Sequence, residues 1–184
     1  DYRKIKTTKF GIYVIMKRKI LKSDKFPIFR HKTTIYGKNI VRDIVHRPDV
    51  AAIIAYHNKK IIVVRQNRFP NGIDIEIPSG NIETHETPIQ SAYREFVEET
   101  GYTAKKMIPF FTFFTSIGYS TQRVHCFIAS DFQKTSKLNL EPGELLKMEV
   151  MSFSKLMKMI MDGKITDSIT LSSILSFAIK KKLI

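Results

Sequence analysis

The segment that begins at Thr87 constrains the fold of this chain most, because both ends of a helix are specified in it. Thr87 has the side chain of an N-cap, Pro88 suits the first helical position, and Gln90 completes a capping box with Thr87. Gly101 ends the segment, and glycine is the usual left-handed residue at a helix C-terminus. These signals predict a helix over residues 88–100. Its apolar residues, which would place it on a sheet, are Ala92, Phe96 and Val97.

The predicted helix carries a group of acidic side chains on one face. Glu95 and Glu99 are four residues apart, Glu98 lies beside them, and Arg94 is four residues before Glu98. Like charges at this spacing destabilise a helix by only about 0.2–0.5 kcal/mol per pair, so a solvated face is one interpretation. Hard divalent cations bind several carboxylate oxygens at about 2.0–2.6 Å, which two glutamates one turn apart offer, so a metal site is the other.

The flanking sequence consists mainly of strand signals. The first 45 residues alternate β-prone and basic residues around a turn predicted at residues 36–39. The runs VAAIIAY and KIIVVRQ are joined by His57, Asn58 and Lys59 and are predicted to form an antiparallel hairpin. Further strands are predicted at IDIEIP, MIPFFTFF and RVHCFIASDF, and later helices at SFSKLMKMIMDG and ITDSITLSSILSFAIKKK. Strands interleaved with two or three helices indicate an α/β or α+β fold.

Composition excludes some classes of protein and indicates a location. No run of 18 or more apolar residues is present, so a membrane span is not expected. The single cysteine, Cys126, cannot form a disulfide within the chain and is typical of a reducing environment. A cytoplasmic protein is therefore expected.

The formal net charge of +14 is placed unevenly. Residues 1–60 hold 16 Lys and Arg against four Asp and no Glu. The lysines are scattered and no aromatic and basic RNA-binding motif accompanies them, so nucleic acid is not expected as a partner. We interpret the charge as ordinary surface charge that also attracts an anionic substrate.

The glutamates of the predicted helix belong to a longer pattern of fixed spacing. It contains a glycine, a glutamate, an Arg-Glu pair, a Glu-Glu pair and a closing glycine. The residues that fill it are Gly80, Glu86, Arg94, Glu95, Glu98, Glu99 and Gly101. This pattern resembles the signature of Nudix hydrolases, in which such glutamates hold magnesium against a diphosphate.

The resemblance extends from about residue 41 to residue 177, towards the ADP-ribose and nucleotide-sugar pyrophosphatases of that family. VVRQNRF followed by IEIPSG resembles the strand, loop and strand before their signature, TSIGYSTQR resembles a later loop, and GKITDSITLSSIL resembles the closing segment. The resemblance implies a Nudix fold, an α/β/α sandwich with a mixed sheet. It also implies an N-terminal β-rich extension over residues 1–46, which builds a homodimer in relatives, and a hydrolase domain over residues 47–184.

The resemblance assigns metal-binding and catalytic roles by position. The backbone carbonyl of Ser79, together with Glu95 and Glu99, is expected to ligate Mg²⁺, with Mn²⁺ as the alternative. Glu98 is expected to bind a second metal ion or to support the first, and Arg94 to orient the glutamates. Gly80, from the same signature, permits close approach of the backbone where a side chain would crowd the site.

The resemblance also indicates residues that bind the substrate. Arg65 or Arg68 is a candidate for binding a phosphate, although each could equally be a surface arginine at a strand edge. Glu76 is a candidate for contacting the base or ribose, with a solvent-facing strand residue as the alternative. Gly118 marks the loop after the sheet that is expected to contact the substrate.

One position departs from the pattern of this branch. Its members carry in the later loop a glutamate that activates the attacking water, and counting from Gly118 this chain has Gln122 there. A neutral amide binds water but does not accept its proton near pH 7. Four interpretations stay open: the base is Glu98 or an acid in residues 141–144, the loop aligns differently, ADP-ribose is a poor substrate, or Gln122 was introduced to trap a complex.

The expected function is metal-dependent hydrolysis of ADP-ribose or a related nucleoside diphosphate sugar to a nucleoside monophosphate and a sugar phosphate. Attack would come from a water that the metal activates. The alternatives are a Nudix hydrolase for GDP-mannose, a UDP-sugar, a dinucleoside polyphosphate or an RNA cap, and a Nudix protein that binds nucleotide without turnover.

Overall fold

The computed structural model describes the whole chain apart from a few short segments, namely residues 1, 9–10, 22–25, 137–145 and 184. The chain divides into two compact units. The first comprises residues 1–48 and 114–123, and the second comprises residues 49–113 and 124–184. Residues 114–123, which interrupt the second unit in the sequence, therefore belong to the first unit.

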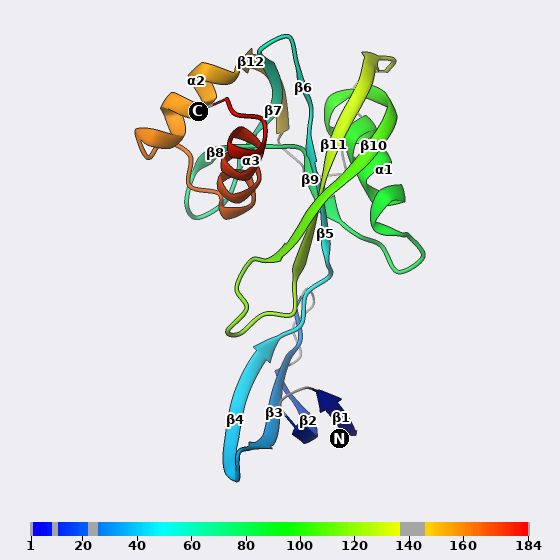
Figure 1. The fold of residues 1–184 in the computed structure, drawn as a ribbon, viewed down its shortest axis with the longest axis vertical. Coiled ribbons are helices and arrows are strands. Elements are labelled where there is room, and N and C mark those ends of the chain that lie inside the picture. Colours follow the sequence, from blue (N-terminus) through cyan, green and yellow to red (C-terminus); the bar gives the residue numbers. More distant parts are fainter. Residues whose placement is uncertain (1, 9–10, 22–25, 137–145, 184) are drawn as a thin grey trace. The chain divides into compact units, whose positions relative to one another are not determined.

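The first unit contains an antiparallel sheet whose four strands follow one another in chain order (Figure 1). They are β1 (Tyr2–Thr8), β2 (Gly11–Leu21), β3 (Ile28–Ile35) and β4 (Lys38–Val45). Tyr36 and Gly37 join β3 to β4 with φ angles of 48° and 72°. Two positive φ angles suit a two-residue hairpin, because they match the twist of the flanking strands. The turn predicted at residues 36–39 is confirmed.

The second unit contributes two further sheets. Their strands are β5 (Val50–Ile54), β6 (Tyr56–His57), β7 (Lys60–Asn67), β8 (Ile73–Glu76), β9 (Ser79–Asn81), β10 (Tyr102–Phe114), β11 (Arg123–Lys134) and β12 (Leu146–Ser152). One sheet has the order β10-β11-β5-β9, and the other has the order β12-β7-β6 with β8 also paired to β7. β11 runs parallel to β5 while β9 runs antiparallel to it, so the first of these sheets is mixed.

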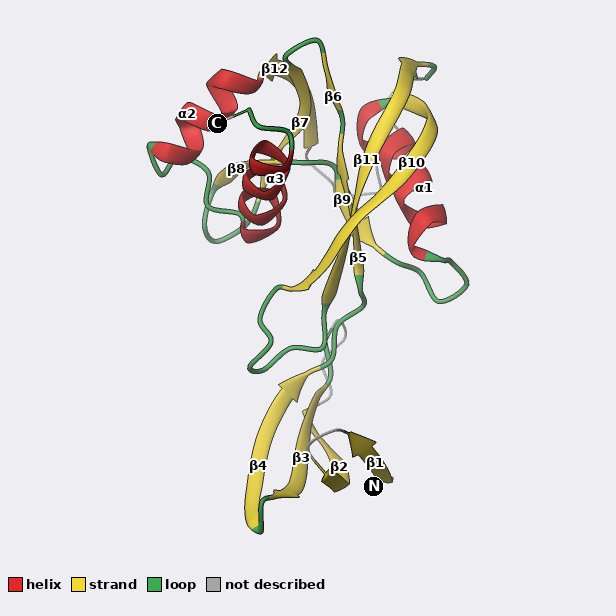
Figure 2. Ribbon diagram, in the orientation of Figure 1, coloured by secondary structure: helices red, strands yellow, loops and turns green. Residues whose placement is uncertain are grey.

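Helices cover the sheets of the second unit from two sides. α1 (Pro88–Thr100) lies on one side of β5, β10 and β11, and α2 (Phe153–Met161) and α3 (Ser168–Lys180) lie on the other (Figure 2). Two hydrophobic clusters match this layering: Phe96 of α1 belongs to one, and Leu156 of α2 and Ile174 of α3 belong to the other. No helix among the described residues is long and apolar enough to cross a membrane.

The hairpin predicted for residues 50–66 forms only in part. β6 and β7 pair through Tyr56 with Ile61 and His57 with Lys60, but β5 leaves this pairing and joins β9 and β11 instead. All five residues of β5 are buried. A strand buried on both faces needs a partner on each edge as well, because its backbone amides and carbonyls have no water to bond. The prediction of one long hairpin was therefore wrong.

The caps predicted for α1 are confirmed. The Thr87 hydroxyl accepts from the backbone N–H of Gln90, and the Gln90 side chain accepts from the backbone N–H of Thr87 at 2.8 Å. Gly101 follows with φ 72°, and its N–H donates to the carbonyl of Val97 at 2.8 Å. Both ends of the helix that carries the glutamates are thus fixed by local bonds.

We predict that Gly101→Ala lowers the free energy of unfolding by about 1 kcal/mol, because a Cβ atom disfavours the left-handed backbone at that position. Urea unfolding measures the change. Gly118→Ala is the matched control, since Gly118 has no positive φ and no atom within 4 Å of an added Cβ. Equal losses in the two variants would contradict the explanation.

Candidate active site

Arg94, on α1, is the centre of a network of carboxylates. Its Nε donates to Glu86 Oε1 at 2.6 Å and its Nη2 donates to Glu86 Oε2 at 2.8 Å. Nη1 donates to Glu95 Oε1 at 2.6 Å and to Glu98 Oε2 at 2.9 Å. Nη2 also reaches the carbonyl of Asn81, in β9, at 3.1 Å. One guanidinium therefore holds three carboxylates and joins α1 to the neighbouring strand.

Charge and burial strengthen this network. The Arg94 side chain is 25% exposed and that of Glu86 is 9% exposed, so water screens their attraction only in part. Hydrogen bonds from Arg94 lower the pKa of Glu86 to about 2. Hydrogen bonds to Glu86, and then to Glu95 and Glu98, raise the pKa of Arg94. Glu86 and Arg94 therefore form an ion pair at neutral pH.

β9 brings backbone groups to the same face of the helix. Glu99 is buried at 3% exposure, and its Oε2 accepts from the backbone N–H of Ser79 at 2.8 Å. Gly80 is cross-strand from Ala51 of β5, and a Cβ atom on Gly80 would overlap the carboxylate of Glu95. The glutamate side chains thus occupy the space that any other residue at position 80 would fill. The close approach predicted for Gly80 is present.

The donor atoms of this face suit a hard cation. Among the described residues, no group of three or more His, Cys, Asp or Glu side chains is arranged to hold a metal ion. One reason is visible in the network, because Arg94 takes an oxygen each of Glu95 and Glu98. The carboxylates of Glu95, Glu98 and Glu99 and the backbone of Ser79 still supply the oxygen ligands that Mg²⁺ and Mn²⁺ prefer. The residues present fit such an ion in chemistry.

Arg68 and Glu76 form a second ion pair in this unit. Arg68 Nε donates to Glu76 Oε1 at 2.8 Å and Nη2 donates to Glu76 Oε2 at 2.6 Å. The Glu76 side chain is 4% exposed and that of Arg68 is 48% exposed. The hydrogen bond to Glu76 raises the pKa of Arg68, and the charges of Asp167 and Glu99 add to this effect. The buried Glu76 thus holds the guanidinium of Arg68 in place. Arg68 is half-exposed and is influenced by the charge of Glu99, a predicted metal ligand.

Arg65 lies elsewhere on β7. Its Nε donates to Glu149 Oε2 at 2.7 Å, and Lys155 Nζ lies 3.7 Å from the other oxygen of Glu149. Because side chains alternate along a strand, Arg65 shares a face with Val63, whereas Glu76 lies opposite Val64 and faces the other way. The structure therefore brings Arg68 and Glu76 together and separates Arg65 from them. A phosphate-binding role for either arginine stays a prediction.

Gln122 and Gly118 belong to the first unit. Gln122 is buried at 2% exposure; its Nε2 donates to the carbonyl of Pro48 at 3.1 Å, and its Oε1 accepts from Thr115 Oγ1 at 3.3 Å. Gly118 is exposed at the tip of the same loop. The two acids offered as an alternative base, Glu141 and Glu144, lie outside the described residues.

Two residues that take part in these networks were given no role from the sequence. Glu86 was recognised only as a position in the signature, yet it makes two of the bonds to Arg94. Asp167 was recognised only as part of the closing segment, although it caps α3 and its charge acts on Arg68. The spacing of Glu86 from Arg94 was visible in the sequence, whereas nothing local connects Asp167 to a residue 99 positions earlier.

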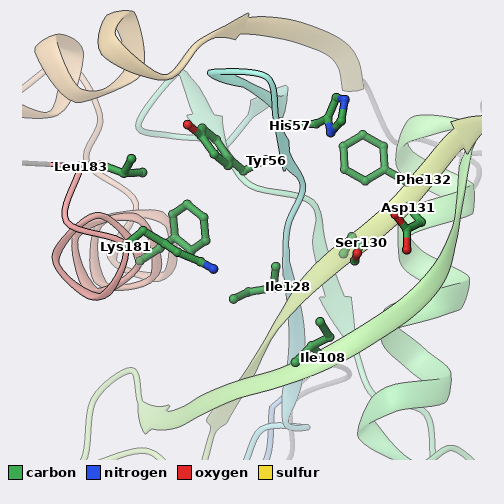
Figure 3. Close-up of a pocket in the computed structure, with 11 residues that line it drawn as sticks. Tyr56, His57, Ile108, Ile128, Ser130, Asp131, Phe132, Lys181 and Leu183 are labelled. Carbon is green, nitrogen blue, oxygen red and sulfur yellow. The ribbon is translucent and has the colours of Figure 1, made fainter.

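A hollow of about 350 Å³ lies in another part of the second unit (Figure 3). Its lining includes Tyr56 and His57 of β6, Ile108 of β10, Ser130 of β11 and Lys181 after α3. None of the predicted site residues lines it. The hollow is separate from the glutamates of α1.

A capped helix that presents carboxylates around one arginine thus lies against a mixed sheet. The sequence profile of the NUDIX domain matches residues 45–169 of the chain. The chain therefore belongs to the Nudix family and is a Nudix hydrolase. The family resemblance expected from the signature is confirmed.

Several curated proteins are similar over most of their length. The ADP-ribose pyrophosphatase of Bacillus subtilis (strain 168) is 34% identical over 150 residues, which cover 80% of this chain and 81% of that protein. The methanol dehydrogenase activator of Bacillus methanolicus is 33% identical over 141 residues, covering 75% and 76%. The GDP-mannose pyrophosphatase of Klebsiella pneumoniae subsp. pneumoniae is 30% identical over 169 residues, covering 83% and 85%.

A solved structure supports the fold. The crystal structure of an ADP compounds hydrolase aligns with a TM-score of 0.78, covering 100% of this chain and 95% of that one at 16% identity. At this identity the likeness concerns the fold alone. The expected α/β/α Nudix fold with a mixed sheet is confirmed.

We predict that Glu86 makes the fold sensitive to acid. Its folded pKa of about 2 lies below the ordinary 4.5, so its contribution is complete above about pH 4.5 and is lost as the pH falls towards 2. With solvent screening the contribution is about 1–2 kcal/mol. In urea unfolding between pH 7 and pH 3, the stability difference between the parent chain and Glu86→Gln should shrink with falling pH. Glu83→Gln, at a half-exposed glutamate, should show no such trend.

We predict that Gly80→Ala displaces the carboxylate of Glu95 and leaves the fold intact, because the overlapping atoms are the far end of a flexible side chain. Manganese affinity, measured by electron paramagnetic resonance, should fall about tenfold or more, while the unfolding midpoint changes little. A variant with parental manganese affinity would show that Glu95 does not hold the ion.

Proposed function

We propose that this chain hydrolyses the diphosphate of a nucleoside diphosphate sugar, with ADP-ribose first and GDP-mannose second among the candidates. The products would be a nucleoside monophosphate and a sugar phosphate. The observation that carries the proposal is the set of carboxylates that Arg94 orders beside the backbone of Ser79 and Gly80. The two substrates come from the names of the relatives in Bacillus subtilis and Klebsiella pneumoniae.

In this proposal Glu95, Glu99 and the carbonyl of Ser79 hold a divalent cation, Mg²⁺ or Mn²⁺, and Glu98 binds a second ion or supports the first. When bound, the cation neutralises diphosphate oxygens and lowers the pKa of a water. Arg94 keeps the carboxylates of Glu95 and Glu98 in place against their mutual repulsion.

Arg68 is the candidate for the substrate's phosphate. Glu76 fixes its guanidinium through two bonds and leaves it 48% exposed. A guanidinium held in this way keeps N–H groups for a phosphate oxygen, since two bonds use only part of its five donors. Glu76 is then a support for Arg68, and the contact with base or ribose first expected of it is the weaker alternative.

Glu98 is the candidate base among the described residues. Its side chain is 30% exposed and only its Oε2 is bonded to Arg94, so Oε1 is open to a water. A general base needs both solvent access and a free lone pair within reach of the proton. An acid in residues 141–144 is the alternative.

The assembly and location of the enzyme are also proposals. A homodimer built through the strands of the N-terminal extension, residues 1–46, would follow the family pattern, with residues 47–184 as the hydrolase domain. The single buried Cys126, whose thiol pKa burial raises to about 11, suits a reducing cytoplasm because it is unreactive there. Light scattering on the full chain measures the oligomeric state.

We predict AMP release from ADP-ribose in millimolar Mg²⁺, and loss of at least about 100-fold in kcat/KM for Glu99→Gln, since a neutral amide is a far weaker metal ligand. Glu83→Gln is the control, since the Glu83 side chain is half-exposed and lies beside His85, and the substitution keeps the backbone N–H that Glu83 donates to Glu86. GDP-mannose, UDP-glucose and a dinucleoside polyphosphate are assayed in parallel. Preference for one of these would change the substrate, and binding without turnover of any would contradict hydrolysis.

A further inference from the structure

The chain crosses from one sheet of the second unit to the other at Ile77 and Pro78. β8 ends at Glu76 and pairs with β7, whereas β9 begins at Ser79 and pairs with β5. Ile77 and Pro78, which we call the crossing, are both buried. A buried segment between two strands lies outside both ladders, so its backbone groups need hydrogen-bond partners from other elements.

Thr170 of α3 is the partner of the first of these groups. The backbone N–H of Ile77 donates to Thr170 Oγ1 at 3.0 Å, and Thr170 Oγ1 in turn donates to Asp167 Oδ2 at 2.7 Å. Asp167 is the N-cap of α3 and also accepts from the backbone N–H of Thr170 at 2.8 Å. Thr170 and Ile77 are both 0% exposed. Because a hydroxyl donates one bond and accepts others, this side chain joins the cap of the helix directly to the crossing.

The next backbone groups are bonded to other elements. The carbonyl of Pro78 accepts from the backbone N–H of Ile53, in β5, at 2.9 Å, and proline itself has no N–H. The N–H of Ser79 donates to Glu99 of α1 at 2.8 Å. The chain is therefore held by α3 before Pro78 and by α1 after it, from opposite sides of the sheets (Figure 2).

The crossing joins two parts of the candidate active site. Glu76, on its N-terminal side, holds the guanidinium of Arg68 through two bonds. Ser79, on its C-terminal side, lies with Gly80 beside the carboxylates of α1. Because only two residues separate Glu76 from Ser79, a change in the backbone at Ile77 moves these two parts relative to each other.

We propose that Thr170 is a positioning residue for the candidate active site. Its hydroxyl fixes the backbone of the crossing and so keeps the carbonyl of Ser79, for the metal ion, and the pair of Arg68 and Glu76, for a phosphate of the substrate, in a fixed relation. Thr170 acts through Ile77 and not by contact with either ligand. The effect on metal and phosphate rests on the proposed function, whereas the attachment of the crossing to α3 does not.

Thr170→Val tests the inference, because valine replaces the hydroxyl by a methyl group and leaves the N–H of Ile77 without its acceptor. Manganese affinity of the folded variant, measured by electron paramagnetic resonance, should fall about tenfold, and KM for ADP-ribose should rise by a similar factor. Thr170→Ser keeps the hydroxyl and should restore both. A residue that only stabilises the fold would lower the unfolding midpoint of Thr170→Val without changing the manganese affinity, and that result would overturn the inference.

Ser173→Ala is the matched control. Ser173 is equally buried on α3, but its hydroxyl bonds no backbone group of the crossing. Its removal should leave manganese affinity and KM at the parental values. An equal loss in Ser173→Ala and Thr170→Val would show that any buried change on α3 disturbs the site, and would overturn the specific role of Thr170.

Hydrogen exchange gives a readout that needs neither metal nor substrate. In Thr170→Val the amide of Ser79 should exchange about tenfold faster relative to the amides of α2, which report the general stability of the unit. Ser79 is bonded to Glu99 and not to Thr170, so faster exchange there shows that the whole crossing has lost its position. Unchanged relative exchange at Ser79 would overturn the inference whether or not the parent chain binds manganese. Faster exchange in a chain that neither binds manganese nor hydrolyses ADP-ribose would refute the proposed function and leave the positioning of the crossing by Thr170 established.

Discussion

The guanidinium of Arg94 holds three carboxylates that would otherwise repel one another, two on α1 and one just before it. Glu86 binds it in a bidentate pair, and Glu95 and Glu98 share its remaining Nη1 group. Each surface pair of this kind contributes little, yet a network of several charges around one partly buried arginine is a stronger case. Because Nη2 also binds the carbonyl of Asn81, the same side chain sets where β9 lies against the helix.

The rest of the site depends on this contact between α1 and β9. Ser79 can bond to the buried Glu99, and Gly80 can lie against the carboxylate of Glu95, only when strand and helix are this close. The two hydrophobic clusters of the second unit support this contact between α1 and β9. Phe96 of α1 packs in one cluster, and Ile174 of α3 packs in the other. The geometry of the candidate site therefore depends on the ion network around Arg94, and the hydrophobic core holds α1 and β9 in the positions that this network needs.

Features fixed by local bonds could be predicted from the sequence, and features fixed by distant partners could not. The caps of α1 and its glutamate face follow from residues within one or two turns, and both were correct. The hairpin at residues 50–66 was overestimated, because the pairing of β5 is decided by β9 and β11. The hydrogen bond from Gln122 to the carbonyl of Pro48 spans 74 positions, and no pattern near either residue indicates it. Which of Arg65 and Arg68 meets Glu76 depended on strand register in the same way.

The Arg94 guanidinium balances part of the charge of the glutamates, and this bears on how much the stability of the fold depends on a bound metal ion. In small zinc domains the binding energy of the ion is the folding energy, so a chelator unfolds them. Here the two hydrophobic clusters and the caps of α1 are formed by protein groups alone, without a metal ligand. Arg94 also compensates part of the acidic charge. Removal of the metal ion would therefore leave a folded, inactive protein that can bind the ion again. Metal supply would then regulate the rate of the enzyme and not its abundance.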